Sequence, residues 1–91
     1  MTYRVKFTSA YKKDYKRAKK RGLDIGLLDA VVDELRQGHT LPAKHRDHEL
    51  KGNWSRFREC HIQPDWLLIY LVEDDILTLT LTNTGTHADV F

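Results

Sequence analysis

The sequence has little cysteine and no long apolar run. Cys60 is the only cysteine, which excludes an internal disulfide and a zinc site built from several cysteines. The longest nearly apolar stretch, residues 66–72, is far shorter than the roughly 20 residues of a membrane-spanning helix. The first residues alternate charged with apolar side chains, so we expect no signal peptide. These absences predict a cytoplasmic protein without a membrane segment.

The length and the distribution of charge narrow the possibilities further. With 91 residues there is no room for a second independent core, so we expect residues 1–91 to form one domain. Residues 1–22 carry nine basic side chains and one acidic one, whereas the rest of the chain is net acidic. Such a basic segment is either a solvated helix face or a contact for nucleic acid. The candidate contact residues are Lys12, Lys13, Lys16, Arg17, Lys19 and Lys20.

Hydrophobic periodicity predicts the order strand, helix, helix, strand, strand, strand. Residues 3–8 alternate like a half-buried strand, and Thr8 and Asp24 can cap helices that end near Gly22 and Gly38. Residues 39–53 show no hydrophobic period, and we predict that they form a long loop. Residues 54–62, 66–72 and 76–82 are strand-like and are separated by short turns. The predicted fold class is α+β, with an N-terminal strand, an αα-hairpin and a three-stranded antiparallel meander in one small sheet.

Four titratable residues lie where this topology brings the ends of segments together. They are His48, His61, Asp65 and His87. A histidine titrates near neutral pH and can donate or accept a proton during catalysis. Any one of these histidines alone reads as a surface residue. Together with a carboxylate and the nearby Arg56 and Arg58, they form a pattern that suits metal-free cleavage of RNA.

A metal site is the first rival interpretation. His45 and His48 stand three residues apart, and Cys60, His61 or Asp65 could add ligands. The spacing matches no named zinc pattern, and Cys60 would point to the strand face opposite His61. The sequence also has no glycine-rich phosphate loop and no Ser–His–Asp pattern, which argues against a nucleotide hydrolase or an esterase. We therefore predict no metal and no cofactor.

Three blocks of sequence resemble the YafQ-type toxins of the RelE/ParE superfamily. They are residues 47–54 (DHELKGNW), 57–70 (FRECHIQPDWLLIY) and 84–91 (TGTHADVF), with residues 7–14 (FTSAYKKD) fitting as well. The resemblance spans nearly the whole chain. It implies a RelE-like microbial RNase fold and a bacterial type II toxin that cleaves mRNA in the ribosomal A site. It also implies a small DinJ- or RelB-like antitoxin as partner, with operator DNA bound only through the toxin–antitoxin complex.

The resemblance also implies roles for individual residues. Four residues match catalytic positions of the family: His48, His61, Asp65 and His87. Glu59 matches an acidic position. Phe91 matches an aromatic residue that places the RNA base. Asn83 departs from the pattern, because an arginine is expected before Thr84 to stabilise negative charge on the phosphate. Lys51, Arg56 or Arg58 could supply that charge instead.

The mechanism that follows uses the 2′-hydroxyl of the RNA as nucleophile and needs no metal. His48 or His61 would act as base and His87 as acid, with Asp65 orienting a histidine or sharing the base role. The basic first helix would then bind ribosomal RNA through backbone charge. Two alternatives share the predicted fold: a ParE-like inhibitor of DNA gyrase, and a catalytically weakened co-repressor that only binds its antitoxin. Asn83 favours the latter.

Overall fold

The computed structural model describes residues 2–83 of the chain. Its helices and longer strands are, in chain order, β1 (Arg4–Phe7), α1 (Ser9–Lys20), α2 (Ile25–Arg36), β3 (Arg58–Gln63), β4 (Trp66–Glu73) and β5 (Ile76–Asn83). The segment between α2 and β3 contains two short 3-10 helices, η1 (Ala43–His45) and η2 (Gly52–Trp54), and the two-residue strand β2 (His48–Glu49). The α+β class is confirmed. The prediction of a plain loop over residues 39–53 is wrong, because a strand of two residues is too short to show a hydrophobic period.

Local sequence signals set the ends of both helices. The hydroxyl of Thr8 accepts a hydrogen bond from the backbone N–H of Tyr11 at 3.1 Å, and the carboxylate of Asp24 accepts one from Gly26 at 3.0 Å. Each cap satisfies a backbone donor that the first turn of a helix leaves without a partner. After α1 the chain turns at Gly22, whose φ of +79° lies in the left-handed region that glycine adopts without strain. The predicted caps are confirmed.

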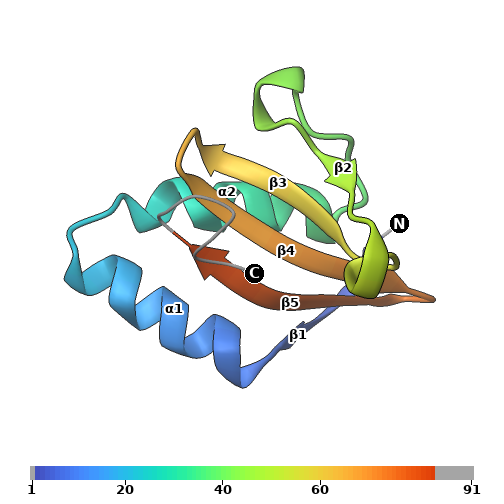
Figure 1. Cartoon of the computed structure of the whole chain (residues 1–91), viewed down its shortest axis with the longest axis horizontal. Coiled ribbons are helices and arrows are strands. Elements are labelled where there is room, and N and C mark those ends of the chain that lie inside the picture. Colours follow the sequence, from blue (N-terminus) through green and yellow to red (C-terminus); the bar gives the residue numbers. More distant parts are fainter. Residues whose placement is uncertain (1, 84–91) are drawn as a thin grey trace.

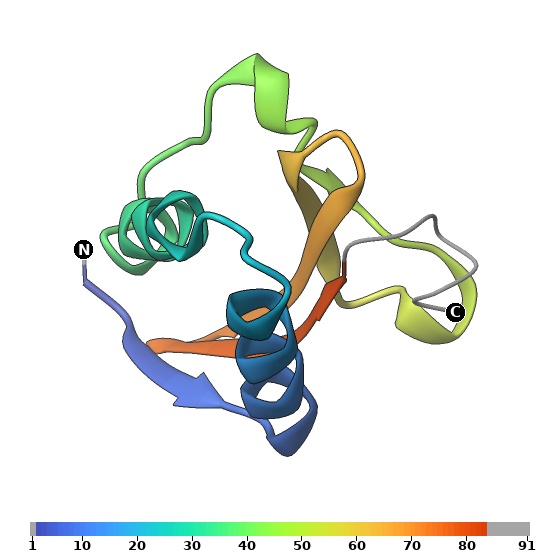
Figure 2. The ribbon, with the colours of Figure 1, turned by 90° about the vertical axis from the view of Figure 1, so that its left-hand side faces the viewer.

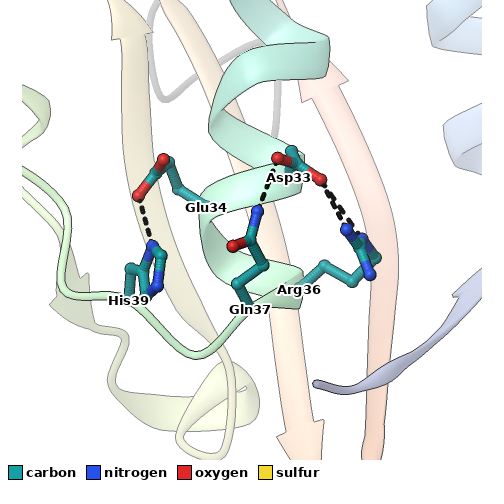
Figure 3. Close-up of polar contacts among 5 residues, drawn as sticks. All are labelled: Asp33, Glu34, Arg36, Gln37 and His39. Atoms are coloured by element: carbon teal, nitrogen blue, oxygen red, sulfur yellow. Dashed lines mark hydrogen bonds and ion pairs between the residues drawn. The ribbon is translucent and has the colours of Figure 1, made fainter. Parts of the chain in front are cut away.

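The end of α2 carries a group of exposed polar contacts (Figure 3). Asp33 accepts hydrogen bonds from Arg36 and Gln37, each at 2.7 Å, and Nδ1 of His39 lies 2.8 Å from Glu34. The hydrogen bond from Arg36 holds the pKa of Asp33 below its ordinary value. The backbone N–H of Tyr3 donates to the carbonyl of Arg36 at 2.7 Å, so the start of the chain is tied to the end of α2.

The sheet has five strands in the order β1-β5-β4-β3-β2 (Figure 1). β1 pairs with β5 in parallel, and the other neighbours are antiparallel. The predicted meander of β3, β4 and β5 is therefore present, but the sheet is wider than predicted, with β1 along one edge and β2 along the other. β1 can run parallel to β5 because the two helices carry the chain across one face of the sheet.

The hydrophobic core lies between the helices and the sheet, and both helices cover the same face (Figure 2). α2 contributes Leu28, Val31 and Leu35 to this core, whereas α1 buries only Tyr11 and Ala18. α1 is thus mostly solvated, as its thin apolar stripe predicts. Within residues 2–83, neither helix has the length and apolar content that crossing a membrane requires.

β4 is buried on both of its faces, as its uninterrupted apolar run predicts. Leu68 and Tyr70 belong to the core under the helices, whereas Leu67 and Ile69 alternate with them and point to the other face of the sheet. We call that other face the outer face. Leu67 and Ile69 are 2% and 0% exposed, so the outer face has a buried apolar floor.

Candidate active site

The outer face carries a histidine and a glutamate that face each other across two strands. His48 of β2 is the register partner of Glu59 of β3, and Nε2 of His48 lies 3.4 Å from Oε1 of Glu59. The side chain of Glu59 is 0% exposed, whereas that of His48 is 45% exposed. A buried carboxylate thus lies directly beside a solvent-accessible imidazole. The short strand β2 creates this pair, because it is the pairing of β2 with β3 that brings His48 to the sheet.

The hydrogen bonds of His48 determine which ring nitrogen can exchange a proton. Nδ1 lies 2.6 Å from the backbone carbonyl of Arg46. A carbonyl only accepts hydrogen bonds, so Nδ1 carries a proton and donates it there. Nε2, facing Glu59, is then the nitrogen that gains or loses a proton. Oε1 of Glu59 lies beside this nitrogen, so the nearest acidic group to Nε2 is a buried one.

His61 lies next to this pair on the same face of β3. The centroids of the His48 and His61 rings are 6.5 Å apart. Nδ1 of His61 lies 3.2 Å from the carbonyl of Pro64 and donates to it, which leaves Nε2 as the ring nitrogen that can contact a substrate. Nδ1 of His45 lies 2.6 Å from the backbone carbonyl of His61. His45 therefore braces the strand that carries His61, a role that its spacing in the sequence does not reveal.

Asp65 lies in the turn between β3 and β4, beyond Pro64, to which the ring of His61 is bound. It is exposed and makes no hydrogen bond or ion pair with another residue in the described part of the chain. The structure therefore puts Asp65 at the same end of the sheet as His61 without joining it to either histidine.

Arg58, one of the arginines expected at the phosphate, lies on the other face of the sheet from the two histidines. Arg58 pairs in register with Tyr70, a residue of the helix-side core, so it lies on the face opposite Glu59 and His61. There its Nε lies 3.2 Å from Asp47, and Nη1 lies 3.7 Å from Glu49. Burial lowers the pKa of Arg58, but hydrogen bonding with Tyr70 and the charge of Asp47 outweigh it and raise the pKa above its ordinary value.

The remaining predicted cations differ from each other in their surroundings. Arg56 forms an ion pair with Glu73, and both side chains are largely exposed. Lys51 is exposed just before η2 and has no ion pair among residues 2–83. Of the three cations predicted at the phosphate, Lys51 is thus the one whose charge is not offset by a described carboxylate.

Asp47 and Tyr70 support the site, and neither was predicted from the sequence. The hydroxyl of Tyr70 donates to Oδ1 of Asp47 at 2.6 Å, and the same oxygen accepts from Arg58. Burial raises the pKa of Tyr70, and the hydrogen bond and charge of Asp47 raise it further, so the phenol stays a donor. The sequence did contain one signal for this hydrogen bond. Tyr70 stands inside an otherwise apolar run, and the hydroxyl of a buried tyrosine needs a hydrogen-bond partner.

Two predicted residues of the site, His87 and Phe91, lie outside the described residues. Residue 83 is the last that the structure describes. Its backbone pairs with Leu67, which in turn pairs with His61, so β5 ends in the same row of the sheet as His61.

The described residues include no group of three or more histidine, cysteine or acidic side chains arranged to hold a metal ion. Cys60 is 0% exposed on the helix side of β3, away from His48 and His61. Burial raises the pKa of its thiol, and the charges of Asp47 and Glu59 raise it further. A thiol that resists deprotonation is a poor metal ligand.

Nearly the whole chain matches the model of one known protein family. The family described as the bacterial toxin of a type II toxin–antitoxin system, YafQ, matches residues 3–91. The chain belongs to the YafQ toxin family. The mRNA interferase toxin YafQ of Escherichia coli K12 is 39% identical over 88 residues, which is 96% of this chain and 94% of that protein. The resemblance read from the sequence is thereby confirmed, and with it the assignment to type II toxins.

Two solved toxin structures share the whole fold. The Escherichia coli DinJ–YafQ toxin–antitoxin complex contains a chain with 37% identity and a TM-score of 0.88, with 100% of this chain and 99% of that chain covered. A metal-bound toxin from Helicobacter pylori has 36% identity and a TM-score of 0.88, with both chains fully covered.

Proposed function

We propose that this YafQ-family toxin cleaves mRNA in the A site of the ribosome, through metal-independent acid–base attack of the RNA 2′-hydroxyl. Membership of the family makes it a type II toxin and an endoribonuclease of the mRNA interferase kind. The observation that carries the mechanism is the outer-face arrangement in which His48 and His61 lie side by side, with the buried Glu59 against His48.

The two histidines supply proton transfer in a way that their hydrogen bonds support. In each ring Nδ1 is occupied by a backbone carbonyl, and Nε2 is the exchanging nitrogen. His48 accepts the 2′-hydroxyl proton at Nε2, and the carboxylate of Glu59 stabilises the resulting imidazolium. His87 protonates the leaving 5′-oxygen, and Phe91 places the base. Asp65 orients His61 or shares its proton once RNA is bound.

Charge stabilisation at the phosphate falls to fewer residues than the sequence suggested. Arg58 and Arg56 are each paired with carboxylates, so we assign them to support of the fold. Lys51 supplies positive charge near the site. Asn83 contributes a hydrogen-bond donor but no charge, which leaves the phosphate with less stabilisation than an arginine would provide.

The basic face of α1 is proposed to hold the toxin on ribosomal RNA. Its lysines and Arg17 are exposed, and among them only Arg17 forms an ion pair within residues 2–83, with Asp14 at 3.5 Å. Phosphate contacts of this kind give affinity without reading sequence. The remaining partner is a small antitoxin like DinJ, which is bound to YafQ in the Escherichia coli complex. We place the toxin in the cytoplasm, where its ribosome and mRNA are, and operator DNA is reached only through the antitoxin.

Cleavage on programmed ribosomes tests this proposal. Purified toxin is incubated with ribosomes stalled at a defined codon, and the mRNA ends are mapped by primer extension. We expect new ends within the A-site codon, and no cleavage of the same mRNA without ribosomes. Intact mRNA together with normal antitoxin binding would instead indicate a catalytically weakened co-repressor.

A further inference from the structure

A cleft of about 430 Å³ opens beside His61, between η1 and the turn that joins β3 to β4. Its wall is apolar where Leu27 of α2 and Ile62 of β3 line it, and cationic where Lys44 and Arg46 line it. The volume is within the range of about 300–1,000 Å³ that is common for small-molecule sites. The cleft therefore has room for one nucleotide unit of a single strand.

The charge of this cleft is not neutralised. Lys44 and Arg46 are exposed, and neither side chain makes an ion pair or hydrogen bond with another residue in the range 2–83. No described carboxylate lines the cleft. Arg56 and Arg58 differ in this respect, because Glu73 and Asp47 already hold them. Among the described residues, the cations that line this cleft are thus Lys44 on η1 and Arg46 just after it.

The backbone that carries these cations is tied to both proposed catalytic histidines. Arg46 has a φ of +47°, a left-handed conformation that is uncommon for residues with a side chain. In this conformation its carbonyl accepts the hydrogen bond from His48. His45, between the two cations, binds the carbonyl of His61 at 2.6 Å. An anion held in the cleft therefore has a defined position relative to His48 and His61.

We propose that this cleft is an RNA subsite in which Lys44 and Arg46 bind a backbone phosphate next to the scissile one, while Leu27 and Ile62 contact the attached nucleoside. The inference rests on the proposed function, since it assumes that His61 faces the scissile phosphate. RNA is favoured over an acidic protein segment because the cations adjoin the proton-transferring histidines. The phosphate next to the scissile one is a single nucleotide away along the strand, and a cationic cleft lined by His61 is placed to bind it.

The test compares two double variants that each remove two positive charges. Lys44→Ala/Arg46→Ala alters the cleft, and Arg4→Ala/Lys6→Ala alters β1 at the opposite edge of the sheet. Isotope-labelled toxin is titrated by NMR with a trinucleotide that carries 2′-deoxyribose at the cleavage position, so that it binds without being cut. The backbone amide of Arg46 and the side-chain amide of Gln63 report on the cleft.

We expect the trinucleotide to shift both amide signals in the wild-type protein. The cleft variant should bind it about tenfold more weakly, as expected when a charge-assisted hydrogen bond is removed. The slope of log affinity against log salt should fall by about 0.7 for each phosphate that the variant no longer neutralises. The β1 variant should match the wild type. On programmed ribosomes the cleft variant should need a higher toxin concentration for half-maximal cleavage.

Three binding results would overturn the inference, and so would one cleavage result. The first binding result is equal trinucleotide binding by the two double variants, and the second is binding of inorganic phosphate in the cleft as tight as that of the trinucleotide. The third is a cleft variant that binds antitoxin more weakly while it retains RNA affinity. The last would assign the cleft to an acidic antitoxin segment. Because the trinucleotide is not cleaved, the titration is informative even if the toxin cuts no mRNA. A toxin that cleaves A-site mRNA equally well with and without Lys44 and Arg46 keeps its proposed function and loses only this subsite.

Discussion

Tyr70 donates its buried hydroxyl to Asp47 across 2.6 Å, and the residue after Asp47 is His48. Asp47 lies against the helix side of the sheet and His48 against the outer face, so the bond anchors the edge strand behind the site. β2 pairs with β3 over only two residues, and so short a ladder gives the edge strand little stability. The Tyr70–Asp47 bond thus contributes to the placement of His48 over Glu59.

Replacement of Tyr70 by phenylalanine should destabilise the fold. A hydrogen bond to a charged group contributes about 1.5–3 kcal/mol, so Tyr70→Phe should lower the free energy of unfolding by about that amount. Urea denaturation measures the change. The matched control is Tyr15→Phe, which removes a hydroxyl 3.4 Å from Asp29 at the surface and should cost less than about 0.5 kcal/mol. Equal effects of the two substitutions would contradict the anchoring role.

Loss of the His48 imidazole should abolish most cleavage. His48→Ala removes a proton acceptor, and one such group contributes about 10²–10⁴-fold to the rate. Single-turnover cleavage on saturating ribosomes measures the effect. His39→Ala is the control, because His39 contacts Glu34 at the exposed end of α2 (Figure 3) and contacts none of the proposed catalytic residues in the described part of the chain. If His48→Ala cleaves at the wild-type rate, the base is another group.

The tail histidine should be equally important to the chemistry and unimportant to the fold. His87→Ala should reduce cleavage by about 10²–10⁴-fold, as expected for the loss of a general acid. The described core cluster is built from residues 11–79, so the melting temperature should hardly change. A well-folded His87→Ala protein with full activity would remove His87 from the mechanism.

Cleavage should survive a chelator. Proton transfer by histidines needs no metal, so excess EDTA should leave the single-turnover rate within about twofold of its value in buffer. The related toxin from Helicobacter pylori has been solved with metal bound, which makes this a discriminating experiment. Loss of activity with EDTA, restored by added zinc, would show that a metal takes part.

An arginine at position 83 should accelerate cleavage. Losing one well-placed donor from a charge-stabilising site costs about 10²-fold, and a charged donor is about twice as strong as a neutral one. Asn83→Arg should therefore raise the single-turnover rate by roughly one to two orders of magnitude, with ribosome affinity little changed. An unchanged rate would mean that cleavage needs no positive charge at position 83 and that Asn83 is simply the last residue of β5.

Much of the fold follows from local signals in the chain. Thr8 and Asp24 cap their helices because short polar side chains satisfy backbone donors within three residues. The unbroken apolar run of β4 indicates a strand covered on both faces, and Leu77 and Leu79 of β5 are buried as their alternation predicts. These features depend on neighbours in sequence and can be read without knowledge of the rest of the chain.

The composition of the site depended on contacts between distant segments. Alternation along β3 places Arg58 on one face of the sheet and Glu59 and His61 on the other. It does not say which of the two faces meets the helices. That depends on the packing of Cys60 and Tyr70 into the core. That packing turns Arg58 toward Asp47 and leaves Glu59 and His61 on the outer face. The formation of β2 likewise depends on residues distant in sequence, because two residues are too few to show a hydrophobic period. His48 meets Glu59 only because β3 supplies the hydrogen-bonding edge on which β2 pairs.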